Sequence, residues 1–274
     1  MEYFLIEKEN GSCVPCIAEV PESPAGIVIV VHGFTSCKES MTGKVLMQHL
    51  PPAGLGVVAY DHPGHGIDAA RFEDLRVGSC LDSLAAVEET VCRRWPNLPV
   101  YYFGSSFGAY ITALYTATRP HKGARAVFRS AAVNMPAILL GDDLRGPDAA
   151  VQEELDRTGY VEPDLNLSGT VRIPAGFFED LKEYDLFQIC RDTAAREAAG
   201  SDAGKDGSIC GTKIHMIHAR GDEVVDFAQA ERFAGEHGIP LTVFEDEHHT
   251  LSDHQETPDK IAQIALRFFT ERSA

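Results

Sequence analysis

A serine flanked by glycines lies between two kinds of sequence pattern. Residues 104–108 are GSSFG; they follow the apolar run Val100–Phe103 and precede a stretch with helical spacing of apolar residues. G-x-S-x-G between a strand and a helix predicts a tight turn, in which the small flanking residues let the two elements pack closely. The Ser106 hydroxyl would then project from the carboxyl edge of a sheet at the start of a helix, whose dipole favours developing negative charge. The pattern predicts a serine nucleophile, with an ordinary turn as the alternative.

Ser105 is the competing nucleophile in this segment. In its register, the positions two before and two after are Phe103 and Phe107, and these side chains are too bulky for such a turn. We therefore predict Ser106 as the nucleophile.

A serine hydroxyl is a weak nucleophile near neutral pH, so it needs a base and an acid that orients the base. With this motif the three residues follow strands in the order serine, acid, histidine. Asp222 comes after the apolar run 214–218 and a turn at Gly221. We favour Asp222 over Glu223 and Asp226 because it is the first acid after that turn; a solvated acidic loop is the alternative.

Two adjacent histidines supply the base. His248 and His249 follow the next apolar run, 240–244, so the chain order of the three residue types is the expected one. The residues alone leave open which of the two histidines acts.

Short apolar runs alternate with stretches of helical spacing along the chain. Apolar runs without polar alternation are typical of strands buried on both faces, and their alternation with helices gives parallel strands joined by crossover helices. We expect an α/β protein with a mostly parallel central sheet and helices on both faces. The expected strands are 27–31, 56–60, 99–103, 126–129, 214–218 and 240–244, after an opening hairpin in 1–20, and the expected helices are about 41–50, 79–94, from the serine to about 118, 226–237 and 257–271.

This alternation is lost in one region, 134–208, which is rich in Asp, Gly and Pro and contains a predicted hairpin at 166–174. We expect a single core domain formed by 1–133 and 209–274 and interrupted by this insertion. Its aromatic segment 177–181 (FFEDL) would line a pocket or form a small core of the insertion itself.

Composition limits the classes of partner and location. The net charge of −17 would repel nucleic acid and anionic membranes, so we expect neither as a partner. Seven cysteines, odd in number and scattered, indicate reduced thiols. The first residues lack the apolar core of a signal peptide, and no stretch reaches the ~18 apolar residues of a membrane span. We expect a cytoplasmic protein; its oligomeric state stays open, a homo-oligomer included.

Several segments together resemble a known family. Residues 32–34 (HGF) after the first buried strand, residues 61–66 (DHPGHG), the GSSFG turn and the strand-end acid and histidines resemble the α/β-hydrolase fold. The chain is similar, over nearly its whole length, to small cytoplasmic serine esterases of the cinnamoyl/feruloyl type. The resemblance implies an oxyanion hole from the backbone N–H groups of Phe34 and Phe107, a cap over the serine from residues 134–208, and no metal or organic cofactor.

The same resemblance distinguishes between the two histidines. Such esterases end this loop with a pattern similar to G-x-x-H-T-φ-S, and residues 250–252 (TLS) align with it when His249 is the base. His248 stays the alternative. The chain departs from the pattern at residues 245–247 (EDE), where the family usually has a glycine, so the resemblance does not fix the geometry of this loop.

The resemblance implies hydrolysis of small carboxylic esters, hydroxycinnamoyl esters among them, through an acyl-enzyme. Ser106 would attack the carbonyl carbon, His249 would transfer its proton to the leaving alcohol, and Asp222 would orient the imidazole. Monoacylglycerol lipases, thioesterases and serine aminopeptidases share this arrangement and remain alternatives. A non-enzymatic binding protein of this fold is disfavoured, because every residue of the triad is present.

Other polar residues near these motifs are assigned mainly structural roles. His32 and Asp61 would brace the loops that carry the HGF and DHPGHG segments. His62 and His65 have a metal-like spacing, but the intervening Pro-Gly turn favours a structural role. His218, at a strand end, would line the site or pack in the core.

Overall fold

A computed structural model describes residues 1–9, 11–141, 144, 146–162, 170–198 and 208–271. Among these residues a nine-stranded sheet occupies the centre, in the strand order β1-β2-β4-β3-β5-β6-β10-β11, with a short β9 paired to β10. The strands are β1 (Glu2–Glu7), β2 (Cys13–Glu19), β3 (Gly26–Val31), β4 (Leu55–Tyr60), β5 (Val100–Ser105), β6 (Gly123–Arg129), β9 (Ser208–Ile209), β10 (Thr212–Ala219) and β11 (Leu241–Phe244).

The sheet is parallel from β4 through β3, β5, β6 and β10 to β11. Antiparallel pairing is confined to the opening hairpin β1–β2, its junction with β4, and β9. The predicted mostly parallel α/β sheet and opening hairpin are confirmed. All carboxyl ends of the parallel strands therefore meet at one edge, where the predicted site residues lie.

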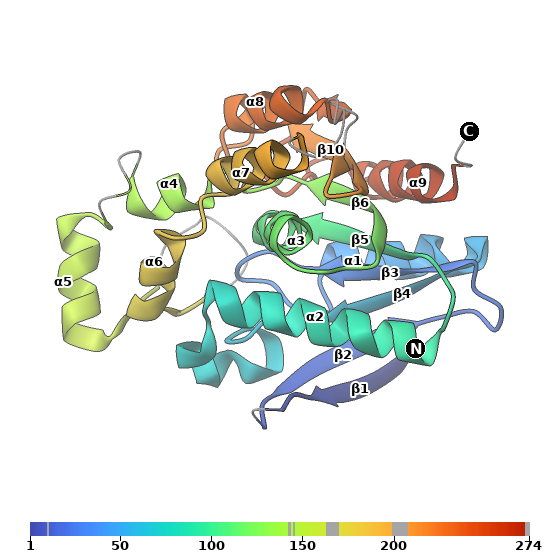
Figure 1. Ribbon diagram of the computed structural model, residues 1–274, viewed down its shortest axis with the longest axis horizontal. Coiled ribbons are helices and arrows are strands. Elements are labelled where there is room, and N and C mark those ends of the chain that lie inside the picture. The colour runs from blue at the N-terminus through green and yellow to red at the C-terminus, as the bar shows by residue number, and fades with distance from the viewer. Residues whose placement is uncertain (10, 142–143, 145, 163–169, 199–207, 272–274) are drawn as a thin grey trace.

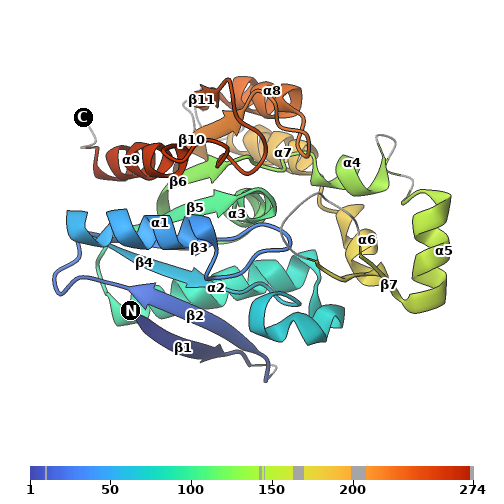
Figure 2. The same ribbon diagram turned by 180° about the vertical axis from the view of Figure 1, so that it is seen from behind.

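Helices cover both faces of the sheet, as Figures 1 and 2 show. One face carries α2, α3 and α7 (Leu186–Ala198), and the other carries α1 and α9, while α8 packs beside β10. The helices outside the insertion are α1 (Met41–His49), α2 (Val77–Arg94), α3 (Phe107–Thr118), α8 (Phe227–His237) and α9 (Thr257–Thr270), with 3-10 turns at Pro51–Ala53 and Gly66–Asp74. No helix among the described residues is both long enough and apolar enough to span a membrane.

The unbroken apolar run of β3 follows from burial on both faces. Ile27, Ile29 and Val31 belong to the hydrophobic cluster that includes α2 and α3. Val28 and Val30 belong to the second cluster, which includes residues of α1 and α9. Since successive strand residues point to opposite faces, a strand with a helix layer on each side needs an apolar residue at every position.

The segment between β6 and β10 leaves the sheet. Its elements from α4 to α6 form a group at one end of the molecule, while α7 returns to pack on α3 (Figure 1). Within the segment, β7 and β8 form a two-stranded antiparallel pair, so the partner of residues 173–174 lies at 160–161. The predicted hairpin at 166–174 falls, up to residue 169, outside the described residues. The elements are α4 (Met135–Leu140), α5 (Ala149–Thr158), β7 (Tyr160–Val161), β8 (Ile173–Pro174), α6 (Ala175–Leu181) and α7 (Leu186–Ala198).

Candidate active site

Ser106 occupies the turn between β5 and α3 in a strained backbone conformation. Its φ of 51° and ψ of −116° lie in a region that residues with a side chain rarely adopt. The turn is held on both sides: Ser106 N donates to the Arg129 carbonyl at 2.8 Å, and the Ser106 carbonyl accepts from Ala132 N at 3.2 Å. This strained turn between strand and helix is the geometry expected of a nucleophile elbow.

The glycines of the motif are required by close packing. A Cβ on Gly104 would lie 2.6 Å from the Ala109 Cα, and a Cβ on Gly108 would overlap the carbonyl oxygen of Val31. Backbone atoms cannot move aside as flexible side-chain ends can. The steric argument made from the sequence therefore holds at both positions.

Ser106, His249 and Asp222 form a continuous hydrogen-bonded line. His249 Nδ1 lies 2.9 Å from each carboxylate oxygen of Asp222, so it carries the proton and donates it. His249 Nε2 then presents a lone pair, and it lies 3.0 Å from the Ser106 Oγ. The hydroxyl proton of Ser106 therefore points at a nitrogen able to accept it.

The Asp222 carboxylate is buried but surrounded by donors. Its Oδ1 accepts from the backbone N–H groups of Val224 at 3.0 Å and Val225 at 2.8 Å, and His218 Nε2 lies 3.1 Å from its Oδ2. Burial alone would raise the pKa of Asp222, but hydrogen bonds from His218, His249 and Val225 outweigh it and hold the pKa well below its usual range. The carboxylate stays ionised at any pH near neutral.

The competing residues of the sequence analysis have other partners. His248 is exposed, and its Nδ1 lies 2.8 Å from Asp253. Glu223 accepts the backbone N–H of His249 at 3.2 Å, and Asp226 caps the start of α8. The geometry brings Asp222 and His249, rather than these neighbours, to Ser106.

The loop that carries His249 is closed by side chains at the position where the chain departs from the esterase pattern. Glu247 is buried and accepts the backbone N–H groups of Asp253 at 2.9 Å and His254 at 3.2 Å. Ser130 Oγ donates to the His249 carbonyl at 2.8 Å. These contacts fix the backbone of the histidine without a glycine at residues 245–247.

Two backbone N–H groups beside Ser106 are free to receive an anion. Phe34 N and Phe107 N donate to no acceptor among the described residues. The rings of Phe34 and Phe107 stack with centroids 4.2 Å apart, which holds their two segments together. A Cβ on Gly33 would lie 3.2 Å from the Ser106 Cβ, so the loop before Phe34 passes directly against the nucleophile. Phe34 and Phe107 therefore both belong to segments that lie directly beside the nucleophile.

His32 ties the loop of residues 32–34 to the segment that follows β4. Its Nδ1 donates to the Gly33 carbonyl at 2.8 Å, and its Nε2 accepts the His62 N–H at 3.0 Å. Burial lowers the pKa of His32 to about 4, so the ring stays neutral. His62 and His65 pack their rings around it. Among the described residues no group of three or more His, Cys, Asp or Glu is placed to hold a metal ion.

Asp61 braces the loop after β3, as predicted. Its carboxylate accepts the Lys38 backbone N–H at 2.6 Å and the Lys38 Nζ at 2.8 Å, and both residues are buried. A Cβ on Gly66 would overlap this carboxylate. The ion pair therefore fastens two loops at the carboxyl edge of the sheet.

Ser106 and His249 open into a cavity of about 290 Å³, which we call the Ser106 cleft. None of the described residues of the insertion lines it. Phe177 of α6 is buried and packs its ring against Phe34 and Phe107 with centroids 5.5 and 5.8 Å away. The aromatic segment therefore neither lines this cleft nor forms a core confined to the insertion; Phe177 and Phe178 join the main hydrophobic core. The cleft is lined by His32, Gly33, Phe34, Thr35, Ser36, Ser40, Thr42, Ser105, Ser106, Arg129, His249 and Thr250.

Two residues at the site were missed or left undecided by sequence reasoning. His218 contacts Asp222, and Arg129 lines the Ser106 cleft. Burial lowers the pKa of Arg129 to about 10, although the charges of Asp222 and Glu247 oppose this. One feature of the sequence could have identified both residues. Each is a polar residue near the carboxyl end of a buried parallel strand, and these strand ends lie at the same edge of the sheet as the nucleophile.

Comparisons with known proteins place these observations in a family. A family model described as serine aminopeptidase, S33, matches residues 22–255. Two Mycobacterium tuberculosis proteins with the provisional name phosphoribosyl transferase are 33% identical over 115 residues, which are 39% of this chain. The match spans 25% of the length of these curated relatives, so it covers one part of larger proteins.

Solved structures share the whole fold at low identity. Est1E from Butyrivibrio proteoclasticus, solved with ferulic acid, has a TM-score of 0.74 at 16% identity over 97% of each chain. A carboxyl esterase from Bacillus coagulans, solved with glycerol, has a TM-score of 0.69 at 18% identity over 98% of this chain and 97% of its own. At these identities the likeness shows the fold alone. Since the family model spans most of the sequence, the chain belongs to the serine aminopeptidase S33 family, and it has the α/β-hydrolase fold.

Proposed function

We propose that this chain is a serine carboxylesterase that cleaves small esters through the triad Ser106, His249 and Asp222. The observation that carries the proposal is the hydrogen-bonded line from Asp222 through His249 to the Ser106 Oγ, with distances of 2.9 and 3.0 Å. A hydroxyl in this setting loses its proton as it attacks, because the acceptor is already aligned and the charge that forms on it faces a carboxylate.

The reaction has two halves. Ser106 Oγ bonds to the ester carbonyl carbon while its proton passes to His249 Nε2; the imidazolium then protonates the leaving alcohol as the carbon–oxygen bond breaks. Water then attacks the acyl-enzyme, with His249 again accepting a proton. His249 returns this proton to the Ser106 Oγ as the acyl–oxygen bond breaks, and the carboxylic acid is released. Asp222 keeps its charge throughout and stabilises the imidazolium.

The tetrahedral intermediate of each half carries an oxyanion. We assign its stabilisation to the N–H groups of Phe34 and Phe107, which have no acceptor among the described residues. Losing one such donor typically costs about 3 kcal/mol of barrier. The Phe34–Phe107 ring stack supports the assignment because it holds the two donors in a fixed relation before the substrate arrives.

Small esters suit the Ser106 cleft because its volume of about 290 Å³ accommodates a short acyl or aryl group. The fold shared with Est1E, solved with ferulic acid, supports hydroxycinnamoyl esters within this class. Amide hydrolysis at an amino terminus is the second candidate, favoured by the description of the family. A panel of p-nitrophenyl esters, aminoacyl anilides and acyl-CoA thioesters separates the candidates.

We also propose that residues 134–208 act as a cap and that the protein works in the cytoplasm. The insertion reaches the site through Phe177, which packs on both phenylalanines of the proposed oxyanion hole. The seven cysteines all carry free thiols, which supports a reducing compartment.

The proposal is tested with Ser106→Ala and a matched Ser105→Ala variant. The first should lower hydrolysis of p-nitrophenyl butyrate by roughly 10⁴-fold or more and abolish labelling by a fluorophosphonate probe, while circular dichroism shows an intact fold. The buried Ser105 hydroxyl has no hydrogen-bond partner in the described part of the chain, so its variant should keep labelling and most activity. Retained labelling in a folded Ser106→Ala protein would contradict the assignment.

A further inference from the structure

A cationic side chain stands beside the proposed nucleophile. Arg129 ends β6, pairs in register with Ser105 on the neighbouring strand, and accepts the Ser106 backbone N–H on its carbonyl oxygen at 2.8 Å. Adjacent strands lie about 4.8 Å apart. The Arg129 side chain therefore starts one strand away from the nucleophile and lines the same cleft.

The Arg129 guanidinium has no partner in the part of the chain that the structure describes: it takes part in no hydrogen bond and no ion pair. Other arginines of the chain behave differently. Arg125, on the same strand, donates to the carbonyls of Phe268 and Glu271, and Arg76 lies 2.6 Å from Asp180. Guanidinium groups shielded from water are normally paired, because removing a charge from water is costly. Arg129 is half-buried and lines the cleft, so its guanidinium can pair with an anion that enters the cleft.

The nearby carboxylates are already used elsewhere. The charges of Asp222 and Glu247 reach Arg129, but neither forms a bond with it. Asp222 accepts from His218 and His249, and Glu247 accepts from the backbone of its own loop. Either carboxylate would have to abandon these contacts to pair with the guanidinium.

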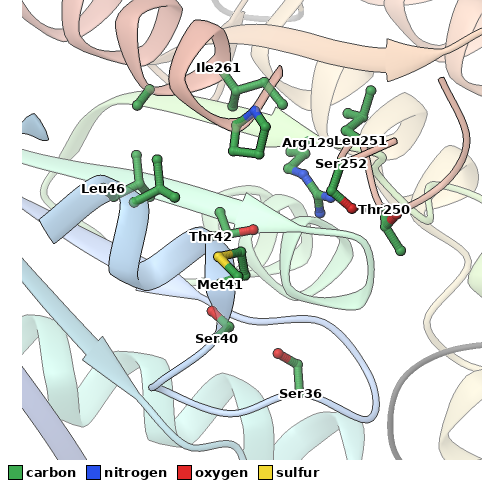
Figure 3. Close-up of a pocket in the computed structure, with 13 residues that line it drawn as sticks. Ser36, Ser40, Met41, Thr42, Leu46, Arg129, Thr250, Leu251, Ser252 and Ile261 are labelled. Carbon is green, nitrogen blue, oxygen red and sulfur yellow. Dashed lines mark hydrogen bonds between the residues drawn. The ribbon is translucent and has the colours of Figure 1, made fainter. Parts of the chain in front are cut away.

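Arg129 also stands where the Ser106 cleft meets a second cavity. This α1–α9 pocket has a volume of about 220 Å³ and shares Ser36, Ser40, Thr42, Arg129 and Thr250 with the cleft. Figure 3 shows the arginine reaching from the end of β6 into the pocket, between the loop of residues 250–252 and the start of α1. The far wall is apolar and is formed by Val45, Leu46, Pro258, Ile261 and Ala262.

The lining of the two cavities suits a monoanion. No Asp or Glu lines either cavity among the described residues, whereas several serine and threonine residues line both. The start of α1, at Met41 and Thr42, faces the same pocket, and a helix N-terminus favours negative charge. One guanidinium balances one negative charge and binds the two oxygens of a carboxylate side by side.

We propose that Arg129 binds a carboxylate of the substrate, so that the preferred esters of this chain carry a carboxylate a few atoms from the scissile carbonyl. This inference rests on the proposed esterase function of the same site. The carboxylate can belong to the acyl part, as in a half-ester of a short dicarboxylic acid, or to the alcohol part. The shared chemistry is an anionic ester in place of the uncharged alkyl ester.

Two pairs of esters test the proposal, because each pair exchanges a terminal methyl for a carboxylate. Monomethyl glutarate is compared with methyl pentanoate, and 4-acetoxybutanoate with butyl acetate, by titrating the released acid at constant pH. The wild-type chain should favour the anionic member of at least one pair by tenfold or more in kcat/KM. The pair that responds identifies the side of the scissile bond on which the carboxylate sits.

Variants then assign the preference to the guanidinium. Arg129→Gln should lower the ratio of anionic to neutral kcat/KM at least tenfold, and Arg129→Lys, which keeps the charge but not the planar fork, should keep part of it. Arg157→Gln removes the same charge from the exposed surface of α5 and should leave the ratio unchanged. Equal losses for both members of a pair, or no preference in the wild-type chain, would overturn the inference.

A binding measurement separates this inference from the proposed esterase function. Calorimetric titration of the Ser106→Ala protein with monomethyl glutarate should show binding that Arg129→Gln abolishes, whether or not the wild-type chain turns the ester over. Binding without hydrolysis of any ester refutes the esterase proposal and supports the carboxylate site. Hydrolysis with no charge preference, or no binding to Ser106→Ala, refutes the carboxylate site and leaves the esterase proposal standing.

Discussion

His218 and His249 contact the same carboxylate from two directions. The His218 Nε2 lies 3.1 Å from Asp222 Oδ2 and 3.1 Å from the Val225 carbonyl, so this nitrogen faces two acceptors and carries the proton. His249 Nδ1 occupies the remaining side at 2.9 Å. Asp222 therefore cannot rotate without losing a donor, and its orientation toward His249 is fixed before any substrate binds.

Removing the His218 donor should slow the chemical step. In His218→Phe we expect kcat to fall about 10-fold to 100-fold with little change in KM, because one hydrogen bond to a charged group is worth roughly 1.5–3 kcal/mol. His218→Gln keeps an N–H near the same place and should recover much of the rate. Steady-state kinetics on a p-nitrophenyl ester measures both. A change confined to KM would argue against an effect through Asp222.

Asp222→Asn should leave the fold intact and lower kcat by about 10⁴-fold, because an amide neither holds the correct imidazole tautomer nor stabilises the imidazolium. Asp226→Asn is the matched control: Asp226 accepts the Ala228 N–H at the start of α8 and does not contact His249. Kinetic measurements should show lost activity in Asp222→Asn and unchanged activity in Asp226→Asn. Thermal unfolding should show that both variants are folded. Similar activity in both would exclude Asp222 as the triad acid.

His62 should make the protein sensitive to acid. Burial lowers the pKa of His62 well below its usual range, and neither ring nitrogen has a partner among the described residues. Below pH 6.5 the unfolded chain takes up a proton at this ring and the folded chain does not, so stability is full above that pH and falls as pH decreases. Between pH 6 and 5 the free energy of unfolding of the wild-type chain should decrease by about 1.4 kcal/mol more per pH unit than that of His62→Phe. Urea titrations at several pH values provide the comparison, and parallel curves for the two proteins would contradict the prediction.

Two glycine-to-alanine changes should have opposite effects on stability. Gly108→Ala would overlap the Val31 carbonyl in the elbow, and we expect a loss of about 3 kcal/mol or failure to fold. Gly235, inside α8, has open space around its Cβ position, so Gly235→Ala should stabilise by about 0.5–1 kcal/mol. Chemical denaturation measures both. A neutral Gly108→Ala would show that the elbow tolerates a looser junction between strand and helix.

The strands of the sheet could be predicted from the sequence because each is marked by a local run of apolar residues. The run of β3 is apolar at every position since both faces are covered, and the glycines of the elbow report a contact within one strand–turn–helix unit. The order of Ser106, Asp222 and His249 then follows from the order of the strands. These features are encoded within a few residues of where they act.

The rest depends on contacts between distant segments. His248 and His249 are neighbours in the chain, and they are distinguished by Ser130, which holds the His249 carbonyl from 119 positions away. Among the described residues Arg129 has no partner, because Asp222 and Glu247 accept hydrogen bonds from other groups, and only the three-dimensional structure decides this. The residue pattern of a short segment cannot predict contacts with segments that are far away in the chain.

The ring of Phe177 touches both Phe34 and Phe107, so three close-packed aromatics connect α6 to the two backbone amides beside the serine. A close-packed interior transmits displacement rather than absorbing it. A displacement of α6 is therefore expected to move the Phe34 and Phe107 rings and, with them, the two backbone amides beside Ser106.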